Sequence, residues 1–266
     1  MNAPKLRPEA IPQRDALSAY YAALPFDVVM RWLRNGEHDG MDCTHLREFA
    51  FIYWSKKKAK TAMGRHKFFD DYTELRDAAI NEAPQRIEVG AVFERARVGG
   101  QSARVMRREL LFDIDMDDYD DVRSCCKNAS MCARCLPLAV ECGRRVESFL
   151  RTHLNYRDIT WIYSGRRGVH CWVRDAEALT LTKDARAAAL VYLRKHFNDD
   201  QLLRLDGAVT TTPTHLCKMP MCVHPSTQRL CVPIDDLATF DIDAVPTLTQ
   251  ALNDNQIVAR YADKLN

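Results

Sequence analysis

The sequence contains no long run of apolar residues. Its longest, Ala187 to Leu193, falls far short of the about 20 residues that a helix needs to span a bilayer. The first twelve residues alternate charged residues with prolines, where a secretory signal would have an apolar segment. Repeats, low-complexity segments and long linkers are missing too. We therefore expect a chain that is neither embedded in a membrane nor secreted, folded as one domain over residues 1–266.

The sequence also lacks a large excess of charge of either sign. Its 38 Lys and Arg residues are nearly balanced by 36 Asp and Glu residues, which leaves a formal net charge of +2. The overall charge therefore does not indicate a nucleic-acid partner, and any site for a polyanion has to be local. Because 47% of the residues are hydrophobic, the chain can bury a full core.

Hydrophobic periodicity predicts an α/β fold. Helices are predicted on both sides of Pro25 between Leu17 and Leu33, from about Leu136 to Leu154, and from Lys183 to Phe197. Strands are predicted at Phe49–Trp54, Arg86–Phe93, Glu109–Asp115, Leu203–Val209 and Leu230–Pro233, with two more, joined by a tight turn, between Ile159 and Val173. Lysine-rich residues 56–60 predict the tip of a hairpin whose second arm is Phe68–Tyr72, and Gly99-Gly100 predicts a break. Glu109–Asp115 has the composition of a buried central strand.

Acidic residues crowd the end of that strand, where six aspartates occur between Asp113 and Asp121. Asp113 and Asp115 share one face, because side chains alternate along a strand. Two carboxylates held side by side repel each other unless a cation lies between them. Proteins hold Mg²⁺ or Mn²⁺ in this way for phosphoryl or nucleotidyl transfer. The pair therefore predicts a site for divalent metal ions.

The four aspartates that follow allow a simpler interpretation. Asp117, Asp118, Asp120 and Asp121 are typical of an acidic turn that keeps the end of a strand solvated.

A second motif, Ser164-Gly-Arg-Arg-Gly168, forms the predicted turn between the two strands of 159–173. Glycines let backbone N–H groups approach an oxyanion, and the planar forks of Arg166 and Arg167 match phosphate oxygens. His170 points to the face opposite Val169 and Cys171, so it emerges beside the turn. The motif predicts a triphosphate site, although arginine-bearing turns are also common surface features.

Four of the ten cysteines form a third motif, Cys125-Cys126-x5-Cys132-x2-Cys135. The Cys-x2-Cys half is a standard zinc spacing, and a site of four thiolates has no open position for chemistry. We expect one structural zinc ion in a knuckle inserted at about residues 122–142. Free or disulfide-bonded cysteines are the alternative.

The C-terminal half offers further candidates. Asp206 lies on the short strand predicted at 203–209. It could supply the third carboxylate that a two-metal site needs, but its spacing from Asp115 along the sequence does not show that the two lie close together in the fold. Lys218 and His224 are possible phosphate contacts, although a lone Lys or His is more often a surface or core residue.

Together these motifs resemble the small, catalytic subunit of archaeo-eukaryotic DNA primase, in its eukaryotic type. The resemblance rests on Phe112-Asp-Ile-Asp-Met-Asp, the paired-cysteine knuckle, Ser164-Gly-Arg-Arg-Gly-Val-His, Arg204-Leu-Asp, Lys218 and Val223-His-Pro. It implies that Asp113, Asp115 and Asp206 bind two catalytic Mg²⁺ or Mn²⁺ ions. It also implies a site for the incoming triphosphate (Ser164, Arg166, Arg167, His170, Lys218 and His224) and one for the initiating nucleotide (Glu48, Arg65 and Arg86).

The same resemblance implies an activity and its setting. The activity is DNA-directed synthesis of short RNA primers from ribonucleoside triphosphates by two-metal nucleotidyl transfer. The partners are a single-stranded DNA template, an iron–sulfur large subunit and a replicative polymerase in the nucleus. Two alternatives stay open: a primase-polymerase that extends with deoxynucleotides in repair, and a catalytically idle, zinc-stabilised scaffold for a partner subunit.

One departure from the family concerns the segment between His170 and Asp206. It leaves room for little beyond one helix, where family members carry a substantial helical subdomain. The resemblance thus implies a primase-type fold with mixed or antiparallel sheets flanked by helices, from which that subdomain is largely absent.

Overall fold

The computed structural model describes residues 13–33, 43–55, 60–97, 101–128, 130–198 and 200–266. Its longer helices are α1 (Arg14–Ala23), α2 (Phe26–Leu33), α3 (Tyr72–Glu82), α4 (Leu136–His153), α6 (Lys183–His196) and α9 (Asn255–Ala262). The shorter ones are α5 (Ala176–Leu179), α7 (Gly207–Thr211), α8 (Leu248–Asn253) and the 3₁₀ turns η2 (Thr44–Leu46), η3 (Met116–Tyr119) and η4 (Asp263–Leu265). In this described part of the chain, no helix is long and apolar enough to cross a membrane.

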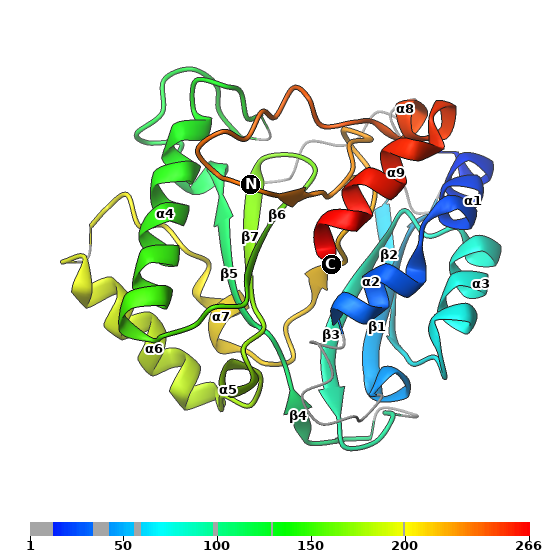
Figure 1. Ribbon diagram of the computed structural model, residues 1–266, viewed down its shortest axis with the longest axis horizontal. Helices are drawn as coiled ribbons and strands as arrows, with labels where there is room; N and C mark the ends of the chain where they lie inside the picture. The colour runs from blue at the N-terminus through cyan, green and yellow to red at the C-terminus, as the bar shows by residue number, and fades with distance from the viewer. Residues whose placement is uncertain (1–12, 34–42, 56–59, 98–100, 129, 199) are drawn as a thin grey trace.

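Two antiparallel sheets form the centre of the molecule (Figure 1). The first has the order β2-β1-β3-β4, with β8 pairing to β3, and the second has the order β5-β7-β6-β9. The strands of the first sheet are β1 (Arg47–Ser55), β2 (Lys60–Lys67), β3 (Arg86–Phe93), β4 (Val105–Arg107) and β8 (Cys217–Lys218). Those of the second are β5 (Leu110–Asp115), β6 (Ile159–Tyr163), β7 (Gly168–Val173) and β9 (Pro233–Ile234). The predicted α/β class with antiparallel sheets is confirmed.

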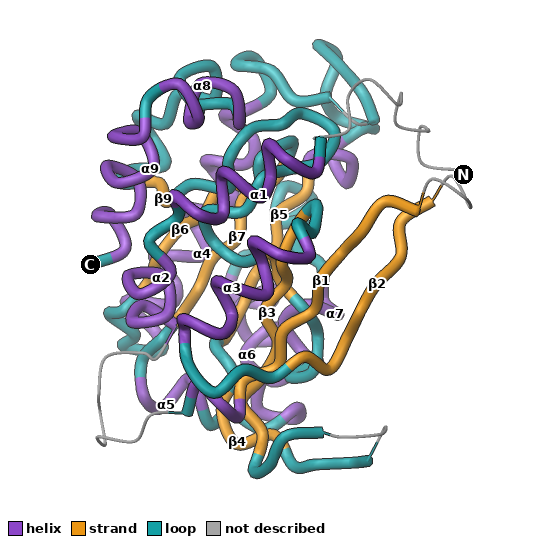
Figure 2. Tube along the Cα trace, turned by 90° about the vertical axis from the view of Figure 1, so that its right-hand side faces the viewer, coloured by secondary structure: helices purple, strands orange, loops and turns teal. Residues whose placement is uncertain are grey.

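Helices cover the outer sides of both sheets. Helices α1, α2 and α3 lie over the first sheet, as the turned view shows, and α4 and α6 lie on the far side of the second (Figures 1 and 2). One buried apolar cluster runs through the whole, with Phe49 from the first sheet and Phe112 and Trp172 from the second among its members. The two sheets therefore share a core.

A buried ion network joins the two sheets. Glu109, which has no exposed side-chain surface, accepts hydrogen bonds from Arg47 at the start of β1 (Nη2–Oε1, 2.9 Å) and from Arg108 (Nη1–Oε2, 2.9 Å). Both arginines also donate to the Gly90 carbonyl in β3. Burial alone would raise the pKa of Glu109, but the two guanidinium groups outweigh it and lower that pKa to about 2. The carboxylate thus stays ionised and fixes β5 against the first sheet.

Most predicted elements are present. The helices flanking Pro25, the helices that begin at residues 136 and 183, strand 86–93 and the hairpin 159–173 all form. Local capping supports the termini; in α6, for example, the Thr182 side chain accepts the Ala185 N–H. The lysine-rich hairpin tip and the Gly99-Gly100 break lie outside the described residues, apart from Lys60, which begins β2.

Four predictions about elements are wrong in detail. Strand β5 is buried but lies at the end of its sheet rather than in the centre. The second arm of the hairpin is the polar stretch Lys60–Lys67, whereas Tyr72 already begins α3, capped by Asp71. Residues 203–206 form no strand, and α7 follows them. The strand predicted at 230–233 is reduced to Pro233–Ile234, after a single bridge at Leu230.

Candidate functional site

The candidate acidic site begins with the pairing of β5 and β7. Asp113 lies opposite His170 in the antiparallel register, and Asp115 lies opposite Gly168. Cross-strand partners share a face, so both aspartates lie on the face that carries His170. The His170 Nε2 atom is 3.6 Å from Asp113 Oδ1. Alternation in the two predicted strands therefore gave the correct face for all three side chains.

Asp206 reaches this site by another route. It is the N-cap of α7, and its carboxylate accepts the Ala208 N–H (Oδ1–N, 2.8 Å). An Asp followed by Gly favours this capping over a strand, which explains the failed strand prediction. The Asp206 N–H donates to the Asp113 carbonyl (3.1 Å) and so docks the start of α7 against β5. The third aspartate thus lies beside the first.

The electrostatics of Asp113 reflect this crowding of acids. Burial raises its pKa, Lys218 lowers it, and the negative charges of Asp115, Asp206 and Asp118 raise it further, to about 7. A carboxyl group whose pKa is raised by burial and by neighbouring like charges is typical of a functional site. Oxygen donors with excess negative charge are also the ligands that Mg²⁺ and Mn²⁺ prefer, so the residues fit such ions.

The three carboxylates do not converge on one point, however. Among the described residues, only the four knuckle cysteines form a group of at least three metal-ligand side chains whose ligand atoms all lie within 4.8 Å. Asp115 instead accepts two hydrogen bonds from Arg167 (Nε–Oδ1, 2.6 Å; Nη2–Oδ2, 3.1 Å), and Asp117 pairs with the same guanidinium at 2.8 Å. The arginine thus supplies positive charge between these acids.

The turn between β6 and β7 is closed by the residues predicted for it. The Ser164 Oγ atom accepts the Gly168 N–H at 3.1 Å. Gly165 has a φ of +84°, and a Cβ atom there would lie 2.6 Å from the Cβ atom of His224. The Thr227 hydroxyl donates to the Gly165 carbonyl at 2.5 Å. The turn therefore packs directly on the segment that carries His224, and only glycine fits at its tip.

Positive charge gathers around two neutral histidines. Burial and, after it, the charges of Lys218 and Arg86 lower the pKa of His170 to about 3 and that of His224 to about 2. Arg166 and Arg167 also lower the pKa of His224. Cations drawn from β3, β8 and the turn thus act on one small volume beside the acids, which suits a polyanion such as a triphosphate.

Cys217 contacts His170 and was not predicted. Its Sγ atom lies 3.5 Å from the His170 Nδ1 atom. Burial raises the pKa of the Cys217 thiol to about 12, so it stays protonated and can donate to Nδ1. The proton of the neutral imidazole is then on Nε2, which faces Asp113. Sequence alone offered no signal for this contact, because β8 has only two residues.

The residues of the predicted initiating-nucleotide site lie on the first sheet. Glu48, fully buried, accepts the Arg65 Nε–H (2.8 Å) and lies 2.7 Å from His66 Nδ1. Arg86 instead pairs with Glu88 (Nη2–Oε1, 2.6 Å), which lies opposite Lys218. The structure thus brings Arg65 to Glu48 and places Arg86 near Lys218. His66 and Glu88 were not predicted. For Glu88 the sequence does contain a signal, because alternation in strand 86–93 puts it on the same face as Arg86.

The acidic turn is more than a solvated loop, because its carboxylates pair with arginines from separate segments. Asp121 accepts two hydrogen bonds from Arg204 (Nη1–Oδ1, 2.5 Å; Nη2–Oδ2, 2.9 Å), next to Asp206. Asp117 pairs with Arg167 of the hairpin turn. The predicted solvated turn therefore binds neighbouring parts of the site to one another.

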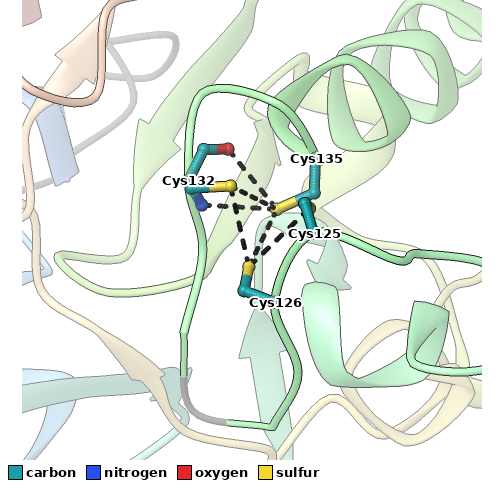
Figure 3. Close-up of side chains that lie close together, drawn as sticks. All are labelled: Cys125, Cys126, Cys132 and Cys135. Carbon is teal, nitrogen blue, oxygen red and sulfur yellow. Dashed lines mark hydrogen bonds between the residues drawn. The ribbon is translucent and has the colours of Figure 1, made fainter.

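The four cysteines of the knuckle point toward a common centre (Figure 3). Their neighbouring sulfur atoms are separated by 3.6 Å (Cys126–Cys135), 3.7 Å (Cys126–Cys132), 3.9 Å (Cys125–Cys126) and 4.0 Å (Cys132–Cys135). A tetrahedron with metal–sulfur bonds of about 2.3 Å has sulfur atoms about 3.8 Å apart. The cluster therefore fits one tetrahedral metal ion such as zinc.

The chain is similar in sequence to several known proteins. The family model described as DNA primase small subunit matches residues 112–236. The DNA primase small subunit of Saccharomyces cerevisiae is 31% identical over 258 residues, covering 93% of this chain and 60% of that protein. The corresponding subunit of Drosophila melanogaster is 35% identical over 187 residues, covering 68% of this chain and 41% of that protein.

The chain belongs to the small-subunit family of DNA primases. Archaeal members are similar as well: the small subunit of Haloarcula marismortui is 31% identical over 155 residues, covering 56% of this chain and 37% of that protein. The chain thus spans about 60% or less of the length of these curated relatives.

A solved structure shares the fold. The polymerase domain of Mycobacterium tuberculosis Ligase D, in complex with DNA, superimposes with a TM-score of 0.56 at 16% identity, covering 99% of this chain and 97% of that one. The predicted primase-type fold is therefore confirmed. Between β7 and Asp206 the described residues form only α5 and α6, in agreement with the expected short segment.

Proposed function

We propose that this primase relative synthesises short RNA primers on a DNA template by nucleotidyl transfer from ribonucleoside triphosphates. One observation carries the proposal: Asp113, Asp115 and Asp206, from two distant parts of the chain, lie on adjoining backbone segments beside a group of cations. Acids that hold divalent ions, next to a cationic pocket for phosphates, are the elements that phosphoryl transfer requires. A scaffold without catalytic function would need neither.

The three aspartates would hold two Mg²⁺ or Mn²⁺ ions. When bound, these ions supply Lewis-acid chemistry: a lower pKa for the attacking 3′-hydroxyl and neutralisation of the leaving pyrophosphate. Asp113 is ionised only above its raised pKa of about 7 in the metal-free protein, so protons compete with cations for this carboxylate. No side chain has to act as a dedicated base.

The incoming triphosphate would bind at the turn after β6. Ser164 and the backbone shape the turn, Arg166, Arg167 and Lys218 provide positive charge, and His224 lines its far side. Neutral His170 can donate its Nε2 proton to a phosphate oxygen without adding charge. Transfer of Arg167 from Asp115 to a phosphate would leave that carboxylate open to cations.

We place the initiating nucleotide at Glu48, Arg65 and Arg86 on the first sheet. The support is their position: the charge of Arg86 acts on both site histidines, so that sheet borders the triphosphate pocket directly. The initiating nucleotide would thus be held by the first sheet, and the incoming triphosphate by the turn of the second sheet together with Lys218.

The cysteine knuckle would hold one zinc ion with a structural role. Four protein ligands leave no coordination site for substrate. Its contribution is therefore to folding and to the order of the neighbouring acidic turn.

The proposed partners and cellular location follow from the family. We propose a single catalytic domain over residues 1–266, a single-stranded DNA template, an iron–sulfur large subunit and a replicative polymerase as partners, and the nucleus as location. The similarity to the small subunits of two yeasts, a nematode and a fly supports this setting.

Dinucleotide synthesis on an oligo-pyrimidine template with Mn²⁺ tests the proposal. Wild type should form product from ribonucleoside triphosphates, and Asp113→Asn should lose it at least a thousandfold, because one metal ligand is gone. Asp77→Asn, on the exposed face of α3, is the matched control and should keep full activity. Equal activity of the two variants would refute the metal assignment.

The same assay separates the alternatives. A preference for deoxyribonucleoside triphosphates would indicate a primase-polymerase of the repair type. No product with either sugar, under conditions where the protein is folded, would favour the scaffold and contradict the proposed function.

A further inference from the structure

Arg123 lies at the base of the cysteine knuckle, and its buried side chain (1% exposed) contacts both the knuckle and the acidic turn. Its Nη1 atom donates to the Ser130 carbonyl (2.6 Å) and points at the sulfur atoms of Cys126 (3.6 Å) and Cys135 (3.8 Å). Its Nη2 atom donates to the Asn128 carbonyl (3.1 Å). One guanidinium thus binds two metal-ligand candidates and the loop between them.

The other edge of the same guanidinium binds the acidic turn. Arg123 Nε donates to Asp120 Oδ1 (2.7 Å), and Nη2 lies 2.5 Å from the same oxygen. The second oxygen of Asp120 accepts the Asn128 N–H (2.8 Å), and the Asp120 N–H donates to the Asp117 carbonyl (3.2 Å). The knuckle and the turn that follows Asp115 therefore share one buried arginine.

These contacts have a specific electrostatic consequence. Four thiolates around Zn²⁺ carry a net charge of −2, which is costly to bury without hydrogen bonds or a counter-charge. Arg123 supplies both, because its fixed fork of donors reaches the sulfur atoms and Asp120 at the same time. Removing it would leave two groups of negative charge facing each other.

We propose that Arg123 is a positioning residue through which the metal-bound knuckle orders the acidic turn. It raises the affinity of the four cysteines for zinc by stabilising their thiolates, and it holds Asp120, and with it residues 116–121, in place. The inference rests on the proposed zinc site. It explains why a structural metal lies directly beside the acids: the metal fixes one end of the segment whose other end carries Asp113 and Asp115.

Zinc affinity is the first test, measured on the full chain in a series of buffered free Zn²⁺ concentrations. Arg123→Met should bind zinc roughly tenfold to a hundredfold more weakly than wild type, the range typical for groups that support metal ligands. Arg134→Met is the matched control, because Arg134 lies in the same knuckle with an exposed side chain; it should stay within about twofold. Arg123→Lys, which keeps the charge but reaches fewer acceptors, should fall between them.

Amide hydrogen exchange of residues 116–123 is the second test. A variant that loses structure in another part of the chain would not show faster exchange in this segment. Removing zinc from wild type should speed exchange in this segment. Zinc-saturated Arg123→Met should exchange there as fast as zinc-free wild type, while zinc-saturated Arg134→Met should not.

The outcomes separate this inference from the zinc proposal. Wild type that binds no zinc would overturn both. Wild type that binds zinc, with Arg123→Met equal to Arg134→Met in affinity, would overturn the inference alone. Weaker zinc binding without faster exchange at 116–123 would overturn the link to the acidic turn.

Discussion

Histidines 170 and 224 show how single residues in this site depend on their surroundings. Both are buried and neutral among cations, and each has one ring nitrogen engaged: His170 Nδ1 by Cys217 and His224 Nδ1 by Ser226 (N–Nδ1, 3.2 Å). In each ring Nε2 is the nitrogen left for a ligand. The motifs indicated both histidines, but their partners could not be predicted, because Cys217 reaches His170 only through the packing of β8.

The lowered pKa of His224 predicts a dependence of stability on pH. In the unfolded chain this histidine takes up a proton near pH 6.5, whereas in the folded protein it does so only near pH 2. Below pH 6.5 the unfolded state therefore binds more protons, and the free energy of unfolding decreases as the pH falls, by on the order of 1 kcal/mol per pH unit.

Urea unfolding at pH 7.5 and 5.5 measures this effect. Wild type should lose roughly 1 kcal/mol more than His224→Gln over this interval. Asp113 and His170 titrate in both proteins, so the difference isolates His224. His153→Gln, at an exposed position of α4, should behave as wild type. An identical loss in wild type and His224→Gln would show that His224 is not buried as a neutral group.

At the scale of elements, the turn at 164–168 depends on one backbone conformation. Gly165→Ala would force a side chain into the left-handed region and against the Cβ atom of His224. We expect the affinity for a ribonucleoside triphosphate to fall about tenfold or more, since the turn has to move away from the segment it packs on.

Gly64→Ala is the matched control, because a Cβ atom at that position in β2 meets its neighbours at 3.4 Å or more. Triphosphate binding, followed by fluorescence of a labelled nucleotide, should be unchanged in this variant. Binding by Gly165→Ala equal to that of Gly64→Ala would exclude the turn as the triphosphate site.

An element can be predicted from the sequence when its own residues determine its structure. Helix α4 and the hairpin of β6 and β7 carry a clear period and clear turn residues, and both form as predicted. Strand β2 is polar and is fixed by pairing with β1, which sequence periodicity does not show. The strand predicted at 203–209 does not form, because Asp206 caps α7 instead.

The candidate site forms only when the two sheets of the molecule pack together. The first sheet contributes Glu48, Arg65, Arg86 and Lys218, and the second contributes Asp113, Asp115 and His170. The family resemblance implied Glu48, Arg65 and Arg86, and the motifs predicted Asp113, Asp115 and His170. The meeting of the two groups depends on how the sheets pack together, which a single sequence does not reveal. The buried network at Glu109 is one contact that joins them.

Glu109→Gln tests this role. The substitution removes the charge that compensates Arg47 and Arg108 in the core, and it should lower the free energy of unfolding by about 3–5 kcal/mol. Glu82→Gln, which removes a partly exposed partner of Lys67, should cost about 1 kcal/mol or less. Chemical denaturation compares the two, and a cost for Glu109→Gln no greater than for Glu82→Gln would show that the network does not hold the sheets together.

The central claim is that three aspartates form one metal site beside the triphosphate turn. Crystals grown with Mn²⁺ and a non-hydrolysable ribonucleoside triphosphate test it most directly through anomalous scattering. The account predicts manganese bound by Asp113, Asp115 and Asp206, with the triphosphate against residues 164–168 and Lys218. A bound nucleotide with no manganese on these carboxylates, or manganese that leaves Asp206 without a bond to it, would contradict the account.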